Sequence, residues 1–213
     1  MRLITFAATL ILLGGCQAVS LGPICTPESV LACPHLEGVW RSSENDGTDR
    51  EFVTIKPKDG RSYGVTPTDG DPPGALTEEC RDRLVELQAV TTNLGGRWFI
   101  DVTYAPKDDD ESGAYVVLMT AQIHCFYRIT MACDDLAVDE MNASWLTGWV
   151  KGHPSQLQLF EGNEGSNAGQ FSGRTLIISP TPRLQEFLGV HASDETAWTP
   201  HKRFHRYQSL VGE

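Results

Sequence analysis

The chain of 213 residues contains no run of about twenty apolar residues, the length that a helix needs to cross a bilayer. Its longest apolar stretch, Leu3 to Leu13, is too short for that purpose. Basic residues are also scarce, with 17 Lys and Arg against 28 Asp and Glu and a formal net charge of -11. Nucleic acids and anionic headgroups are bound by basic surfaces. The sequence therefore predicts no transmembrane helix and no nucleic-acid partner.

Signatures of catalysis and metal binding are weak. The chain has no Ser-x-x-Lys motif, and the glycine-rich stretch Gly162 to Gly173 lacks the Gly-Lys-Ser/Thr ending of a phosphate-binding loop. The consecutive acids Asp108 to Glu111 indicate a solvated loop, because calcium loops alternate their ligands with spacers. His201 and His205 are four residues apart, but their cationic neighbours indicate a solvated tail rather than a metal site. We therefore expect no cofactor, no metal and no enzyme active site.

The first sixteen residues have the layout of a secretory signal. Arg2 supplies a positive n-region, and the apolar stretch after it ends in a small-residue cleavage site. The segment Leu13-Gly14-Gly15-Cys16 resembles the lipobox of bacterial lipoproteins, in which the cysteine receives a diacylglycerol and the leader is removed. This resemblance implies a lipid-anchored protein of the bacterial cell envelope. Gln17, rather than aspartate, follows the cysteine and favours the periplasmic face of the outer membrane; an ordinary secreted protein is the alternative.

Six cysteines in an exported chain indicate an oxidising compartment. An odd number remains once Cys16 carries lipid. Cys25 and Cys33 flank a short loop, and we expect them to form a disulfide. Cys125 and Cys133 are eight residues apart on one predicted strand, or about 26 Å at ~3.3 Å per residue, and cannot pair without a bend. The pairing of either one with Cys80 stays open.

Short apolar runs between turn signals predict a mainly β fold. The first run contains Gly38-Val39-Trp40, and Asp59-Gly60 is a good hairpin turn between two later runs. Seven further strands are predicted at Phe52 to Lys56, Ser62 to Thr66, Arg83 to Val90, Trp98 to Tyr104, Ile123 to Met131, Leu136 to Met141 and Thr175 to Ser179. We expect an antiparallel barrel or sandwich of about eight strands.

Two short helices are predicted toward the C-terminus. Asn142 or Ser144 can cap the first, which carries Trp145, Leu146, Trp149 and Val150 at helical spacing and ends at Gly152 or Pro154. Thr181 can cap the second, with Pro182 at its first position. Its stripe of Leu184, Phe187 and Leu188 is expected to be buried against the barrel.

The order of several motifs resembles a family of uncharacterised bacterial lipoproteins with a lipocalin-like barrel. The motifs are Gly38-Val39-Trp40, Leu87 to Val102, His124 to Ile129, Trp145-Leu146, and Leu184 to Leu188 followed by His191-Ala192. The resemblance covers roughly Leu36 to Trp198. The resemblance implies a mainly β, antiparallel lipocalin-like β-barrel, and it implies no activity. The expected organisation is a signal peptide at 1–15, a lipid-anchored tether at 16–35 and the barrel domain with its C-terminal helix at 36–213.

Four residues on the predicted strands are candidates for the lining of a cavity: Trp40, Trp98, Ile100 and Tyr127. They would bind an apolar small molecule, or else fill the core, since small barrels are often packed solid. We expect a non-enzymatic envelope lipoprotein that binds an apolar small molecule. The alternative is a structural or protein-interaction component with a packed barrel and a partner that the sequence does not identify; an enzyme is least favoured.

Overall fold

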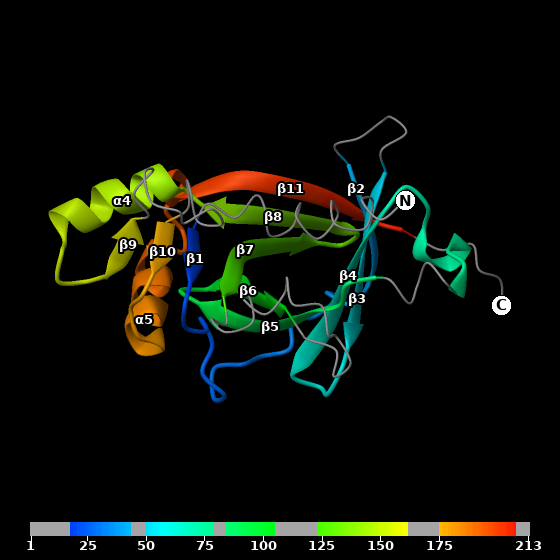
Figure 1. Cartoon of the computed structure of the whole chain (residues 1–213), viewed down its shortest axis with the longest axis horizontal. Coiled ribbons are helices and arrows are strands. Elements are labelled where there is room, and N and C mark those ends of the chain that lie inside the picture. Colours follow the sequence, from blue (N-terminus) through cyan, green and yellow to red (C-terminus); the bar gives the residue numbers. More distant parts are fainter. Residues whose placement is uncertain (1–17, 44–49, 79–83, 105–122, 162–174, 208–213) are drawn as a thin grey trace, which may run out of the picture.

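The structure, a computed structural model, describes residues 18–43, 50–78, 84–104, 123–161 and 175–207. Eight of its strands form a closed antiparallel barrel (Figure 1). They are β2 (Gly38–Ser42), β3 (Glu51–Pro57), β4 (Ser62–Asp69), β5 (Leu87–Leu94), β6 (Arg97–Tyr104), β7 (His124–Ala132), β8 (Asp135–Met141) and β11 (Trp198–Arg206). The barrel is closed by pairing of β6 with β7 and of β11 with β2. The predicted mainly β barrel of about eight strands is confirmed.

The turn between β3 and β4 shows how local sequence sets this topology. The Asp59 carboxylate accepts hydrogen bonds from the backbone nitrogens of Arg61 and Ser62, at 3.0 and 2.7 Å, and Gly60 adopts a φ of 76°. An aspartate that bonds its own turn and a glycine at positive φ are the residues that a tight hairpin needs. The predicted hairpin therefore forms where the sequence places it.

The closing strand β11 differs from the prediction. We expected residues around His201 and His205 to form a solvated tail, but both lie in this strand, which pairs with β8 and β2. The register shifts between Pro200 and Lys202. This irregularity breaks the alternation of apolar and polar side chains by which a strand is recognised in a sequence.

Alternate side chains of all eight strands point into the barrel and, with three residues of the N-terminal segment, form one buried cluster. The buried members are Val19, Cys33, Leu36, Trp40, Val53, Ile55, Tyr63, Val65, Leu87, Ala89, Ile100, Val102, Cys125, Tyr127, Ile129, Leu136 and Phe204. We call this cluster the interior core. Successive strand residues point to opposite faces, so the neighbours of these residues face outward.

A second layer covers part of the outer wall of the barrel (Figure 1). It contains α4 (Ala143–Gly152), α5 (Thr181–His191), β1 (Ala18–Ser20), β9 (Leu159–Glu161) and β10 (Thr175–Ile177), with the short 3-10 turn η2 (Glu195–Ala197); a similar turn, η1 (Pro73–Ala75), lies after β4. Outward-facing Phe99, Phe126 and Met141 pack there against side chains of both helices. We call this second layer the annex.

Both predicted helices form, with one difference at a cap. The Asn142 side chain caps α4 by accepting from the backbone nitrogen of Trp145 at 3.0 Å, as predicted. In α5 the cap position is Pro180, and Thr181 lies one residue further on. The Thr181 hydroxyl instead donates to the carbonyl of Pro23 at 2.8 Å. That bond ties the helix to the N-terminal segment.

Residues 18–35, predicted as a tether, are instead folded against the barrel and contribute side chains to both the interior core and the annex. Ala18 to Ser20 pair with β10 and β7. Further on, Leu31 donates to the carbonyl of Thr91 at 2.9 Å, and the Thr92 hydroxyl donates to the carbonyl of Ser29 at 2.8 Å. These bonds are irregularly spaced, so the segment shows no periodicity although it is folded.

Candidate functional site

The four candidate cavity residues lie together in the barrel. Trp40, Ile100 and Tyr127 are buried members of the interior core, and Trp98 is half-buried and packs against it. The indole nitrogen of Trp40 donates to the carbonyl of Leu36 at 2.9 Å. The surface of the described residues has two hollows, one beside Arg206 and one beside α4, and none of these four residues lines either of them.

Buried charges interrupt the apolar interior. The Glu51 side chain lies on the same face of β3 as Val53, and its carboxylate pairs with the ammonium of Lys202 from β11. Both side chains are about nine-tenths buried, at 10 % and 11 % exposure. Nearby in β11, His201 stacks on the ring of Tyr127 with centroids 5.6 Å apart. A closely paired charge can be buried at tolerable cost, whereas an apolar ligand beside it would gain little.

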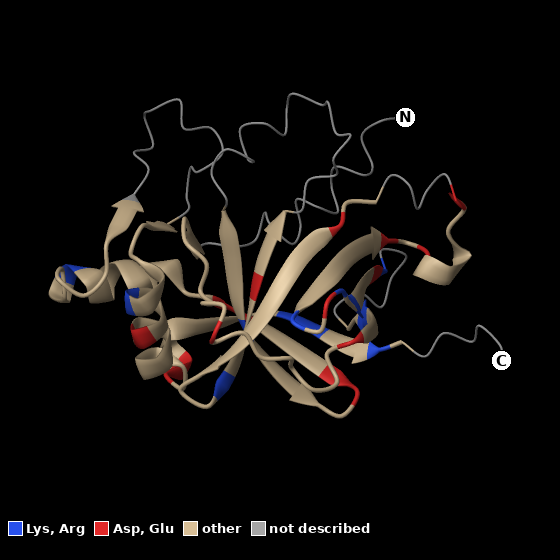
Figure 2. Ribbon diagram, turned by 90° about the horizontal axis from the view of Figure 1, so that it is seen from below, with Lys and Arg blue, Asp and Glu red and all other residues tan. Residues whose placement is uncertain are grey.

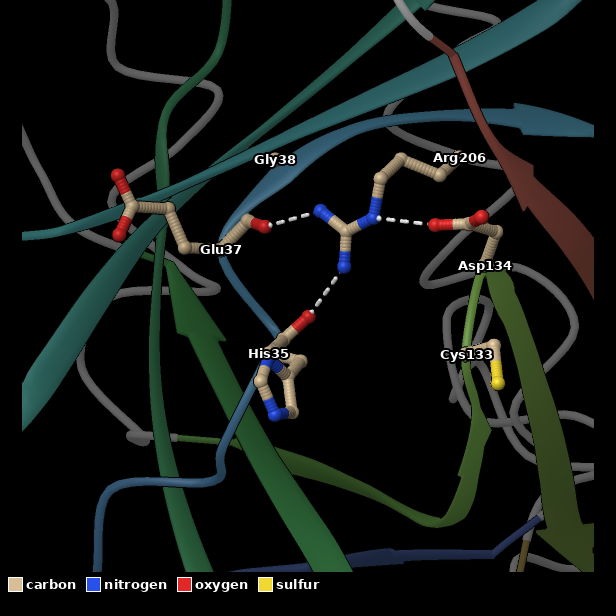
Figure 3. Close-up of a pocket in the computed structure, with 6 residues that line it drawn as sticks. All are labelled: His35, Glu37, Gly38, Cys133, Asp134 and Arg206. Carbon is tan, nitrogen blue, oxygen red and sulfur yellow. Dashed lines mark hydrogen bonds and ion pairs between the residues drawn. The ribbon is translucent and has the colours of Figure 1, made fainter.

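The side chain of Arg206 makes several contacts where β11 ends, close to the start of β2 and the β7–β8 turn (Figure 3). Its guanidinium donates to the carbonyls of His35 and Glu37, at 2.7 Å each, and its Nε lies 3.2 Å from Asp134 Oδ1. The same group lies 4.3 Å above the ring of Trp40, a cation–π arrangement. The guanidinium thus locks the N-terminal segment, the β7–β8 turn and β11 to one another.

A hollow of about 630 Å³ adjoins this lock and is lined by His35, Glu37, Gly38, Cys133, Asp134 and Arg206. Gly38 has a φ of 146°, and a Cβ there would lie 2.5 Å from Arg206 Nη1. A side chain there would force the guanidinium to move, and the positive φ also favours glycine. The hollow carries two carboxylates, and its cation already has three oxygen partners, so it offers no site for an anion.

The expected disulfide between Cys25 and Cys33 is absent, and both are free, buried thiols. Cys33 belongs to the interior core, whereas Cys25 packs with the annex on the outer wall. The segment between them runs along β5, held by Thr91 and Thr92, and so cannot close the short loop that the spacing indicated. Cys133 is an exposed free thiol in the turn after β7, while Cys80 lies outside the described residues, as do Cys16 and Asp108 to Glu111.

A buried histidine–aspartate pair lies beneath the N-terminal segment. His124 Nδ1 is 2.9 and 3.0 Å from the two carboxylate oxygens of Asp101, and Asp101 Oδ2 also accepts from the backbone nitrogen of Ile24 at 2.9 Å. His124 Nε2 is buried and has no hydrogen-bond partner in the described part of the chain. Burial, together with the charge of Asp101, raises the pKa of the Cys25 thiol to about 12. A thiol held protonated is a poor nucleophile, so this cluster is not an activated cysteine site.

The sequence also contains a Gly-x-Ser-x-Gly pattern, which is associated with catalysis but has a structural role in this fold. Gly60-Arg61-Ser62-Tyr63-Gly64 matches the Gly-x-Ser-x-Gly pattern of a nucleophile elbow, which requires a strand, a sharp turn and a helix. Here the segment instead lies in the β3–β4 hairpin. The Ser62 hydroxyl donates to Asp59 at 2.8 Å, and this bond lowers the pKa of Asp59. Ser62 is therefore a turn residue rather than a nucleophile.

The annex carries a second hollow and an aromatic cluster. The hollow, of about 730 Å³, is lined by Thr147, Val150, Lys151, Pro154, Leu157, Gln158, Leu159 and Ile178, and we call it the annex groove. On the other side of α4, Trp149 stacks on His153 with centroids 4.4 Å apart and meets His191 of α5 edge-on at 5.0 Å. Burial lowers the pKa of His191.

Comparisons with known proteins identify no relative. No family model, curated protein or solved structure matches the chain. Among the described residues there is no helix long and apolar enough to span a membrane. The same residues contain no group of three or more His, Cys, Asp or Glu side chains placed to hold a metal ion.

Proposed function

We propose that the protein is a lipid-anchored lipoprotein of the bacterial cell envelope, held through Cys16 on the periplasmic face of the outer membrane. Support comes from the lipobox-like segment Leu13-Gly14-Gly15-Cys16 and from the apolar leader before it. Two acyl chains on one cysteine are enough for lasting attachment, because each buried methylene contributes about 0.8 kcal/mol. Membership of the lipocalin-like lipoprotein family is part of this proposal and rests on the order of its motifs.

The molecular role that the geometry supports best is a non-enzymatic structural or protein-interaction domain that acts through its outer surface. One observation carries this proposal: inward-facing side chains from all eight strands are buried together in the interior core. The paired charges of Glu51 and Lys202 in the same interior also disfavour carriage of an apolar small molecule. Figure 2 shows basic residues scattered among acidic ones, which fits a partner other than nucleic acid.

The anchor is tested by metabolic labelling with a palmitate analogue. The wild-type protein is expected to take up the label and to fractionate with membranes, and Cys16→Ser is expected to lose both properties. Labelling that is unchanged in Cys16→Ser would overturn the proposed anchor.

The packed interior is tested by titrating the purified protein with a fluorescent fatty acid. We expect no saturable binding. Saturable binding that is lost in Ile100→Trp, which fills the interior, and kept in a control variant at an exposed site, Val190→Trp, would establish carriage of an apolar ligand instead.

A further inference from the structure

The annex groove exposes apolar surface at one end of the molecule. It lies between the second half of α4, the segment after that helix, and the ends of β9 and β10 (Figure 1). Lys151 is the one charged residue of its lining. Val150 and Leu159 are half-buried there, and Ile178 is 42 % exposed. A concave apolar surface of this kind is a site for an apolar partner.

The groove lies close to the point where the lipid would be attached. Strand β1 runs parallel to β10, with Ala18 beside Thr175 and Ser20 beside Ile177, and Ile178 comes next, at the edge of the groove. Three residues along β10 span about 10 Å at ~3.3 Å per residue. In the sequence only Gln17 separates Cys16 from Ala18, and two residue steps reach at most about 7 Å, so the path from Cys16 to the level of Ile178 is at most about 17 Å.

From these two features we propose that the annex groove rests against the bilayer that holds Cys16, with phospholipid acyl chains as its occupant. This inference rests on the proposed lipid anchor. Because so little chain separates the anchor from β1, the annex cannot stand away from the membrane, and its apolar groove is the surface there suited to lipid. No basic patch is needed, because the covalent anchor supplies the attachment.

The orientation also places the other end of the molecule away from the bilayer. Strand β11 begins beside the annex and runs to the other side of the barrel, where it ends at Arg206 (Figure 1). The Arg206 lock and its hollow belong to the barrel and not to the annex. They would face the aqueous compartment.

The test uses the full-length lipidated protein in vesicles of phosphatidylcholine that carry a photoreactive diazirine on an acyl chain. After illumination, modified residues are mapped by peptide mass spectrometry. We expect lipid adducts on the groove residues Val150, Leu159 and Ile178, and none on the residues that line the hollow beside Arg206. Adducts with the labelled phospholipid, rather than with the protein's own unlabelled lipid, identify the bilayer as the source.

Two variants test whether the lipid adducts depend on the apolar surface of the groove. Ile178→Asp introduces a charge at an exposed groove position and is expected to reduce groove adducts several-fold. The matched control Val190→Asp changes a residue of α5 that is 73 % exposed and outside the groove lining, and is expected to leave the map unchanged. The wild-type map does not depend on whether either variant folds.

The outcomes separate the two proposals. Protein that floats with the vesicles but carries no adducts in the groove would overturn the lipid-facing groove and leave the anchor standing. Groove residues without lipid adducts, in a protein that sediments as a dimer after extraction in detergent, would overturn it in favour of self-association. Protein that neither takes up palmitate nor floats would overturn the anchor itself.

Discussion

At the scale of single residues, Arg206 joins parts of the fold that are far apart in the sequence. Its guanidinium bonds two carbonyls of the N-terminal segment, approaches Asp134 in the β7–β8 turn and lies over the ring of Trp40. Arg206→Ala removes two charge-assisted hydrogen bonds, the partner of Asp134 and the cation above the ring. We expect the free energy of unfolding to fall by about 2–3 kcal/mol in urea denaturation.

The control for this variant is Arg203→Ala in the same strand. The Arg203 side chain is 45 % exposed and pairs with Asp139 at 3.1 Å. An exposed pair of this kind contributes about 1 kcal/mol or less. Equal decreases in the free energy of unfolding of the two variants would mean that Arg206 contributes no more to stability than an exposed ion pair.

The thiols give a second prediction at the residue scale. Burial raises the pKa of Cys25 to about 12 and that of Cys33 to about 11, so both stay protonated at neutral pH. Iodoacetamide should therefore modify exposed Cys133 in the folded protein, and should modify Cys25 and Cys33 only after denaturation. Peptide mass spectrometry without prior reduction measures all three. Recovery of a peptide in which Cys25 is linked to Cys33 would contradict the free thiols.

At the scale of elements, the β5–β6 turn packs against α5. A Cβ on Gly95 would lie 2.2 Å from the carbonyl oxygen of Gly189, whereas a Cβ on Gly96 would meet nothing within 4 Å. Both glycines have positive φ, at 58° and 78°. Gly96→Ala should cost about 1 kcal/mol through backbone strain alone.

Gly95→Ala adds a collision to the same strain. We expect it to cost about 2 kcal/mol more than Gly96→Ala, because the helix must move away from the turn. Thermal melts of the two variants measure the difference. Equal melting temperatures would show that the β5–β6 turn and α5 are not in tight contact.

The elements also show what the sequence can predict. The β3–β4 hairpin follows from Asp59-Gly60, and β6 follows from strict alternation over Trp98 to Tyr104. Strands β1 and β9 have three residues each, too few for any period to be visible. The pairing of Asp101 with His124 depends on how β6 aligns with β7, and Ile24 reaches Asp101 from 77 positions away. Spacing in the sequence carries no signal for such contacts.

At the scale of the whole molecule, stability should depend on pH through His191. Burial lowers its pKa in the folded state; the charge of His153 lowers it further, and that of Asp194 opposes this. As the pH falls below about 6.5, His191 binds a proton in the unfolded chain before it does so in the folded chain. The free energy of unfolding therefore decreases from its value at neutral pH. The melting temperature should therefore decrease between about pH 7 and about pH 5.

His191→Gln removes this proton uptake and should flatten the decrease. The control is His35→Asn, at an exposed position with a φ of 63° that asparagine tolerates. It should keep the slope of the wild-type protein. A wild-type slope in His191→Gln would assign the pH dependence to other groups.

The pairing of β1 with β10 constrains the order in which the strands can pair as the chain folds. Ser20 bonds the carbonyl of Ile177 across 157 positions of chain, and β2 needs β11 to close the barrel. A chain that emerges N-terminus first therefore presents its earliest strands long before their partners exist. Such distant pairings slow folding, since the entropy of closing a long loop is lost before the contacts form. The residues nearest the start of the domain are thus among the last to find their place, and until then their backbone groups are open to any chaperone that recognises an unpaired strand.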